Sequence, residues 1–129
     1  MKSTLWHLPL SILFIMVIIG CSNNQNDAPA AIERYIQALI AKDENLLINH
    51  SCAAWEIEAK NEFNSFSAVS VSLEDLSCQE TGQDGEYTLV SCNGKIIANY
   101  GNEILEINLA DQNYLAIYDG GEWRMCGYR

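Results

Sequence analysis

Basic residues are scarce in this sequence, and their scarcity excludes one class of partner. The 129 residues include 7 Lys and Arg against 17 Asp and Glu, which gives a formal net charge of −10. A protein that binds nucleic acid gathers Lys and Arg on one face to neutralise phosphates. Here the few basic residues are scattered among acidic ones. No nucleic acid is therefore expected as a partner, and the acidic surface is not expected to attract anionic lipid headgroups.

An apolar run long enough to span a bilayer is also lacking. Residues 5 to 19 contain no charge, but they number only fifteen, whereas a spanning helix needs about 20 apolar residues. The run follows Lys2, and a basic residue before a short apolar segment is typical of a secretory signal peptide. We therefore expect residues 1 to 20 to be a signal peptide, with an uncleaved membrane anchor as the alternative.

The end of the apolar run indicates the kind of signal. Ile18, Ile19, Gly20 and Cys21 resemble the lipobox of bacterial lipoproteins. The resemblance implies that the thiol of Cys21 is joined to diacylglycerol, that cleavage makes Cys21 the first residue, and that acyl chains such as palmitate hold the protein on a membrane. Two or three acyl chains anchor a protein far more durably than one. The alternative is a cysteine that closes an ordinary signal peptide by chance.

A polar tether and one domain are expected after Cys21. Residues 22 to 27, SNNQND, contain no core-forming side chain, and loss of the signal peptide leaves 6 Lys and Arg against 17 Asp and Glu, a formal charge of −11. Ser22 is not the aspartate that resembles an inner-membrane retention signal. We therefore expect the protein in the cell envelope, facing outside the cytoplasm, on an outer membrane or cell surface. The expected divisions are a signal peptide in 1–20, the lipidated cysteine and tether in 21–28, and one domain in 29–129.

Closely spaced cysteine pairs are absent, which argues against a zinc site. Cys52, Cys78, Cys92 and Cys126 are separated by 25, 13 and 33 residues, whereas zinc fingers use pairs two to four residues apart. An even number of cysteines in a small exported domain favours disulfides, and four cysteines allow three pairings. Cys78 and Cys92 are equidistant from Gly85 in a hairpin signal, so they are expected to face each other across two strands. Cys52 is then left to pair with Cys126.

Hydrophobic periodicity predicts helices first and strands afterwards. Residues 29 to 41 repeat apolar side chains at helical spacing, with Asp27 placed to cap the helix. Asp43 is predicted to cap a second helix, and residues 53 to 66 continue as helix. From residue 68 onward, apolar residues alternate with polar ones, which is typical of strands. We predict an α+β fold in which N-terminal helices pack on a curved four-stranded antiparallel sheet.

Acidic residues in the predicted elements are expected to face solvent. Glu56, Glu58 and Glu62 lie in the helical segment, where a solvated helix face is a simpler interpretation than a metal cluster. Glu106 alternates with Leu105 and Ile107 on a predicted strand and should point away from the core. No metal and no cofactor are expected.

The order of these elements resembles a known fold. A helical half that begins near IERYIQALIAKD, followed by a meander that ends in DGGEWRMCGY, is similar to the nuclear-transport-factor-two-like fold, also called the cystatin-like cone. More narrowly, the chain resembles small bacterial lipoproteins of unknown function that carry such a domain after a lipobox. The resemblance covers residues 28 to 129 and implies a concave pocket between helices and sheet. The superfamily includes isomerases and dehydratases as well as domains without activity.

Catalytic motifs are not evident in the domain. His50 is the only histidine after the signal peptide, and it lies two residues from Cys52, so on a helix the two side chains would point apart. We predict no catalytic residues and a non-enzymatic domain that binds a small apolar ligand or an envelope protein. The alternative is a small isomerase or dehydratase that uses a pocket acid or His50, and it requires a buried group with a shifted pKa facing a cavity. The aromatic residues predicted to line the cone, or simply to fill its core, are Tyr35, Trp55, Tyr100 and Tyr114.

Overall fold

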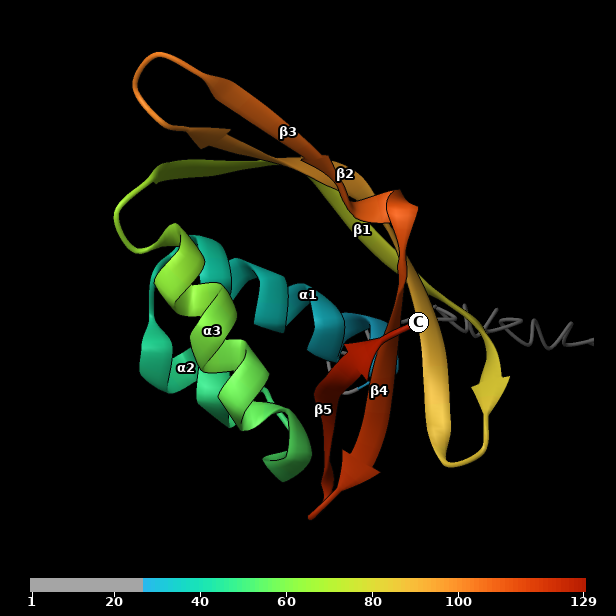
Figure 1. The fold of residues 1–129 in the computed structure, drawn as a ribbon. Helices are drawn as coiled ribbons and strands as arrows, with labels where there is room; N and C mark the ends of the chain where they lie inside the picture. The colour runs from blue at the N-terminus through green and yellow to red at the C-terminus, as the bar shows by residue number, and fades with distance from the viewer. Residues whose placement is uncertain (1–26) are drawn as a thin grey trace, which may run out of the picture.

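Three helices lie inside the curve of an antiparallel sheet (Figure 1). The computed structural model describes residues 27–129, so the predicted signal peptide and Cys21 lie outside the described residues. The helices are α1 (Ala28–Ile40), α2 (Glu44–Asn49) and α3 (Glu56–Phe66). The strands are β1 (Ser70–Asp84), β2 (Tyr87–Asn99), β3 (Ile104–Asn108), β4 (Asn113–Asp119) and β5 (Glu122–Tyr128). The fold class is therefore α+β, as the sequence predicts.

Side-chain caps begin the first two helices. The carboxylate of Asp27 accepts a hydrogen bond from the backbone N–H of Ala30 at 2.9 Å, and Asp43 accepts one from Leu46 at 3.0 Å. Each cap satisfies a backbone donor that has no partner within the helix. Pro29 occupies the first turn of α1, where its fixed φ suits a helix start. None of the helices in residues 27–129 is long and apolar enough to cross a membrane.

One side of α1 supplies much of the core. Its residues Ile32, Tyr35 and Ile36 are buried against Val90 of β2 and Met125 of β5, all five with 2% exposure or less. Because apolar residues recur at steps of three and four along α1, they form a single stripe that packs on the sheet. Burial of this stripe, at about 25 cal/mol for each Å² of apolar surface, is the main force that holds the helical layer in place.

The sheet has five strands rather than the predicted four. Its order is β1-β2-β4-β5, and β3 also pairs with β2. A short 3₁₀ turn, η2 (Leu109–Asp111), separates β3 from β4, and the side chain of Asn108 accepts a hydrogen bond from the N–H of Ala110 at 3.1 Å. As a result, β3 pairs with the second half of β2 and β4 with its first half. The capping turn divides what periodicity alone presents as one strand.

Two disulfides join the pairs that the sequence predicts. Cys78 and Cys92 are directly opposed in the β1–β2 ladder and are bonded to each other. Cys52 is bonded to Cys126, across a sequence separation of 74 residues. The backbone N–H of Cys52 also donates to the carbonyl of Met125 at 2.8 Å. This second bridge therefore fixes the segment between α2 and α3 to the last strand.

Candidate functional site

A cleft of about 380 Å³ opens between helices α1 and α3 and the concave face of the sheet. Its volume lies at the lower end of the range for small-molecule sites. Its apolar walls come from Ile36, Leu39, Phe66, Ile96, Ile107 and Leu109. Its polar groups come from Tyr35, Glu62, Ser65, Gln112, Tyr114 and Tyr128. The cleft thus combines mainly apolar walls with one acidic side chain.

Both oxygens of that acid are held by phenols. The hydroxyl of Tyr35 donates to Oε2 of Glu62 at 2.6 Å, and the hydroxyl of Tyr128 donates to Oε1 at 2.5 Å. The indole N–H of Trp55 donates in turn to the oxygen of Tyr35 at 3.1 Å. We call these four residues the Glu62 cluster. Hydrogen bonds to a charged acceptor are stronger than neutral ones, so the arrangement favours a carboxylate at the centre.

Each member of the Glu62 cluster comes from a different element. Glu62 belongs to α3, Tyr35 to α1 and Tyr128 to β5, while Trp55 ends the 3₁₀ turn η1 (Ala53–Trp55). The rings of Trp55 and Tyr128 meet edge to face, with their centroids 5.3 Å apart. Because η1 follows Cys52 directly, the long disulfide positions Trp55 as well. The site therefore depends on contacts that are distant in the sequence.

Burial determines the pKa values in the cluster. Burial raises the pKa of the Glu62 carboxyl above its ordinary value, and the hydrogen bonds from Tyr128 and Tyr35 oppose that effect by stabilising the charge. Burial, followed by the nearby negative charge of Glu62, raises the pKa of both phenols. Burial also raises the pKa of the neighbouring Tyr114 to about 12. The phenols therefore stay protonated at neutral pH and remain hydrogen-bond donors.

Two of the four predicted aromatics line this cleft. Tyr35 and Tyr114 line it, and Trp55 lies behind Tyr35 and donates to it. Tyr100 does not line it, because it follows β2 in the turn to β3 and is 49% exposed. This hairpin forms one end of the sheet and stands apart from the helices (Figure 1). Tyr100 therefore does not contribute to the cleft.

Glu62 is the residue that the sequence interpretation placed wrongly. It was expected on a solvated helix face, but it turns toward the core and lines the cleft. Its spacing carries a signal, because Trp55, Ala59, Glu62 and Phe66 follow steps of four, three and four and so share one face of a helix. Glu106, by contrast, is exposed as expected and pairs with Lys95 at 3.3 Å. In residues 27–129, no three His, Cys, Asp or Glu side chains are grouped to hold a metal.

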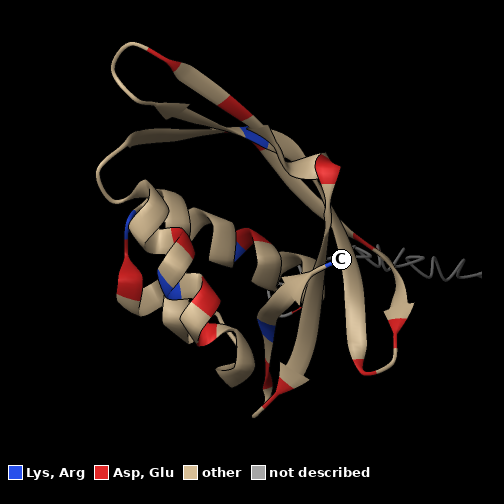
Figure 2. Cartoon of the chain, viewed as in Figure 1, with Lys and Arg blue, Asp and Glu red and all other residues tan. Residues whose placement is uncertain are grey.

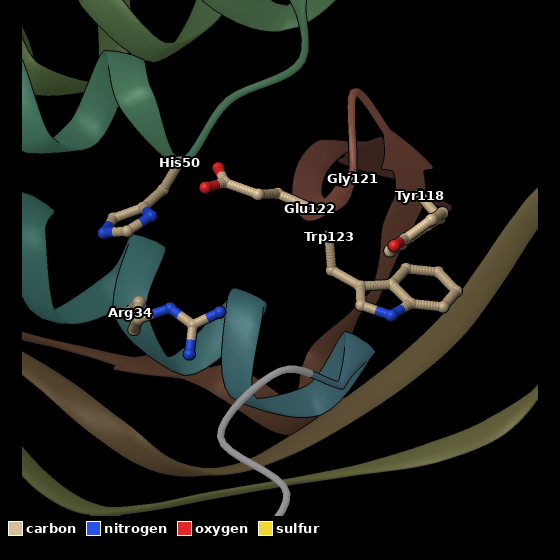
Figure 3. A pocket seen from close by; sticks show the side chains of 6 residues that line it. All are labelled: Arg34, His50, Tyr118, Gly121, Glu122 and Trp123. Atoms are coloured by element: carbon tan, nitrogen blue, oxygen red, sulfur yellow. The ribbon is translucent and has the colours of Figure 1, made fainter.

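His50 lies in a different cleft, of about 220 Å³, together with Arg34 and Glu122 (Figure 3). It caps the C-terminus of α2, and its carbonyl accepts a hydrogen bond from the N–H of Met125 at 2.8 Å. Burial lowers the pKa of His50, and the positive charge of Arg34 adds to that effect. The structure therefore does not bring His50 into the Glu62 cluster, and its backbone has a structural role at the helix end.

Comparison with known proteins finds no family model and no curated protein that matches this chain. Among solved structures, the chain is similar to the solution structure of RPA3114, a SEC-C motif containing protein from Rhodopseudomonas palustris. The two share 11% sequence identity over 78% of this chain and 75% of that chain, with a TM-score of 0.48. A likeness of this degree carries no argument about function, which therefore has to come from the site itself.

Proposed function

We propose that this protein is a lipid-anchored, extracytoplasmic binding protein whose cleft takes a small ligand with a largely apolar body. The observation that carries the proposal is the cleft itself, in which six apolar side chains surround a carboxylate held by Tyr35 and Tyr128. Such a mixture of apolar walls and a few fixed polar groups is typical of small-molecule sites. In this proposal the domain is a cystatin-like cone of the nuclear-transport-factor-two-like kind, and the cleft is its concave pocket.

The proposed location rests on Cys21 and on the cysteines of the domain. Residues 1 to 20 act as the signal peptide, and acyl chains on Cys21 hold the domain outside the cytoplasm. The two disulfides support this location, because structural disulfides persist in oxidising compartments. The domain itself binds its ligand without a catalysed reaction.

Substitution of Cys21 tests the anchor. Cys21→Ser removes the thiol to which diacylglycerol would be joined, so the variant is expected to carry no acyl groups. Fractionation followed by intact mass measurement checks this. The control is the unsubstituted protein, whose mass should correspond to a chain that begins at Cys21 and carries acyl groups. A membrane-bound protein with a free sulfhydryl at Cys21, or with residues 1 to 20 still attached, would contradict the proposal.

A blocking substitution at the mouth of the cleft tests ligand binding. Ser65 is exposed on α3 and lines the cleft, so Ser65→Trp places an indole in the opening without removing a core side chain. Binding of the neutral apolar dye Nile red, followed by fluorescence, is expected to weaken at least about tenfold. Asn64→Trp adds the same ring at a neighbouring exposed position that does not line the cleft. Equal affinity of both variants and the parent protein would contradict the proposed site.

A second candidate function is an acid–base enzyme of the isomerase or dehydratase type. The observation that favours it is a carboxyl of raised pKa beside two phenols in a cleft, since such a carboxyl can accept a proton and a phenol can stabilise an oxyanion. Binding remains the first proposal because both phenols already donate to Glu62. Their hydroxyl hydrogens are therefore not free to stabilise an oxyanion. Turnover that is abolished by Glu62→Gln would favour the enzyme.

A further inference from the structure

We infer that the ligand of the cleft carries an organic ammonium group, and in particular a quaternary one such as trimethylammonium. This inference rests on the proposed binding function and names the chemical class of its ligand. It is carried by three features of the cleft: its charge, its aromatic rings and its apolar walls.

The charge of the cleft is negative and uncompensated. Among the twelve lining residues, Glu62 is the only acid, and none is Lys, Arg or His. None of the ion pairs found within residues 27–129 involves Glu62. The few Lys and Arg are spread over separate elements (Figure 2). A neutral ligand would leave this partly buried charge without a counter-ion and an anionic ligand would be repelled, so a cation fits best.

Four aromatic residues line the cleft together with Glu62. Tyr35, Phe66, Tyr114 and Tyr128 all line the cleft. The rings of Tyr114 and Tyr128 meet with centroids 5.2 Å apart and planes inclined at 62°, so two walls stand at an angle to each other. The negative face of an aromatic ring attracts a cation, and cages of such rings are the common solution for binding quaternary ammonium groups.

The apolar walls of the cleft distinguish between ammonium types. A primary ammonium has three N–H donors that lose water on binding and need acceptors. Each oxygen of Glu62 accepts one phenol hydrogen and keeps a second lone pair, while the apolar walls offer no acceptor to an ammonium that lies against them. A quaternary ammonium has no N–H donor and a methylated surface, so it compensates the charge of Glu62 and also packs against the apolar walls. The cleft therefore favours the quaternary form.

Calorimetric titration with choline and its neutral isostere tests this inference. The isostere, 3,3-dimethyl-1-butanol, has the same shape with carbon in place of nitrogen. The full protein, purified in dodecyl maltoside to avoid charged detergents, is expected to bind choline at least about tenfold more tightly than the isostere at pH 7. Soluble dihexanoylphosphatidylcholine, used below its micelle concentration, tests whether the same group is taken from a lipid headgroup. Choline binding without phospholipid binding indicates a free cation, and binding of both indicates a headgroup.

Two variants assign the effect to the cleft. Glu62→Gln should reduce the preference for choline over the isostere to about threefold or less, whereas Glu103→Gln, which removes an exposed charge from the turn between β2 and β3, should leave it unchanged. Phe66→Leu keeps an apolar wall but removes an aromatic ring. It should therefore weaken the binding of choline and leave the binding of the isostere unchanged. Equal binding of choline and isostere would overturn the ammonium inference and leave the binding function standing. If none of choline, the isostere and Nile red binds, both the ammonium inference and the proposed binding function would be overturned.

Discussion

Replacing both Cys52 and Cys126 with alanine is expected to lower the free energy of unfolding by about 4.5 kcal/mol. The bridge joins residues separated by 74 positions, so its removal restores a large loop entropy to the unfolded chain. It also removes the covalent link between β5 and the segment that carries Trp55, which then depends on the backbone hydrogen bond from residue 52 to Met125. Urea unfolding of the double variant without reductant measures the loss.

The shorter bridge is the matched control for this experiment. Cys78 and Cys92 are separated by only 14 positions, and the same loop-entropy argument gives about 3 kcal/mol for their double replacement with alanine. The β1–β2 ladder already places the two residues opposite each other. A loss from Cys78→Ala with Cys92→Ala that equals or exceeds the loss from the longer bridge would contradict the argument.

Removing the two phenol hydroxyls of the Glu62 cluster is expected to cost about 3 kcal/mol of stability at pH 7. Tyr35→Phe with Tyr128→Phe keeps both rings but takes the hydrogen bonds from both oxygens of Glu62. The carboxylate would then be partly buried without these donors, and the pKa of Glu62 would rise further. Thermal or urea unfolding measures the change, and Tyr118→Phe, at an exposed ring, is the control.

The loss of stability caused by removing the two hydroxyls is expected to depend on pH. Burial raises the pKa of Glu62 in the folded protein above the ordinary value of 4.5, so folding favours the protonated carboxyl, and this contribution is lost as pH rises through the folded pKa. The cost of the double Tyr→Phe change should therefore be small at pH 4 and large at pH 7. In a Glu62→Gln background it should be small at both. An equal cost at both pH values in the parent background would show that the hydroxyls stabilise something other than the carboxylate.

The sequence predicted the features that depend on local chemistry. The caps at Asp27 and Asp43 follow from residues three positions apart. The pairing of Cys78 with Cys92 follows from their equal distance from Gly85, because a hairpin places such residues opposite each other. The long bridge then follows by elimination. Each of these features involves short stretches of chain or simple register.

The position of Glu62 could not be predicted in the same way. A glutamate on an amphipathic helix normally faces water, and its burial here depends on Tyr35 and Tyr128, which lie 27 and 66 residues away in the sequence. No periodicity shows that two phenols will meet one carboxylate. The exposure of Tyr100, in the turn between β2 and β3, is likewise a property of the assembled fold.

The most direct test of this account is an NMR titration of the side-chain carboxyl carbon of Glu62, with and without saturating choline. The account predicts a midpoint above 4.5 in the free protein, because burial outweighs the phenol hydrogen bonds. It predicts a lower midpoint with choline, because a nearby cation favours the carboxylate. A midpoint at or below 4.5 in the free protein, with no response to choline, would contradict a buried carboxylate that recognises an ammonium ligand.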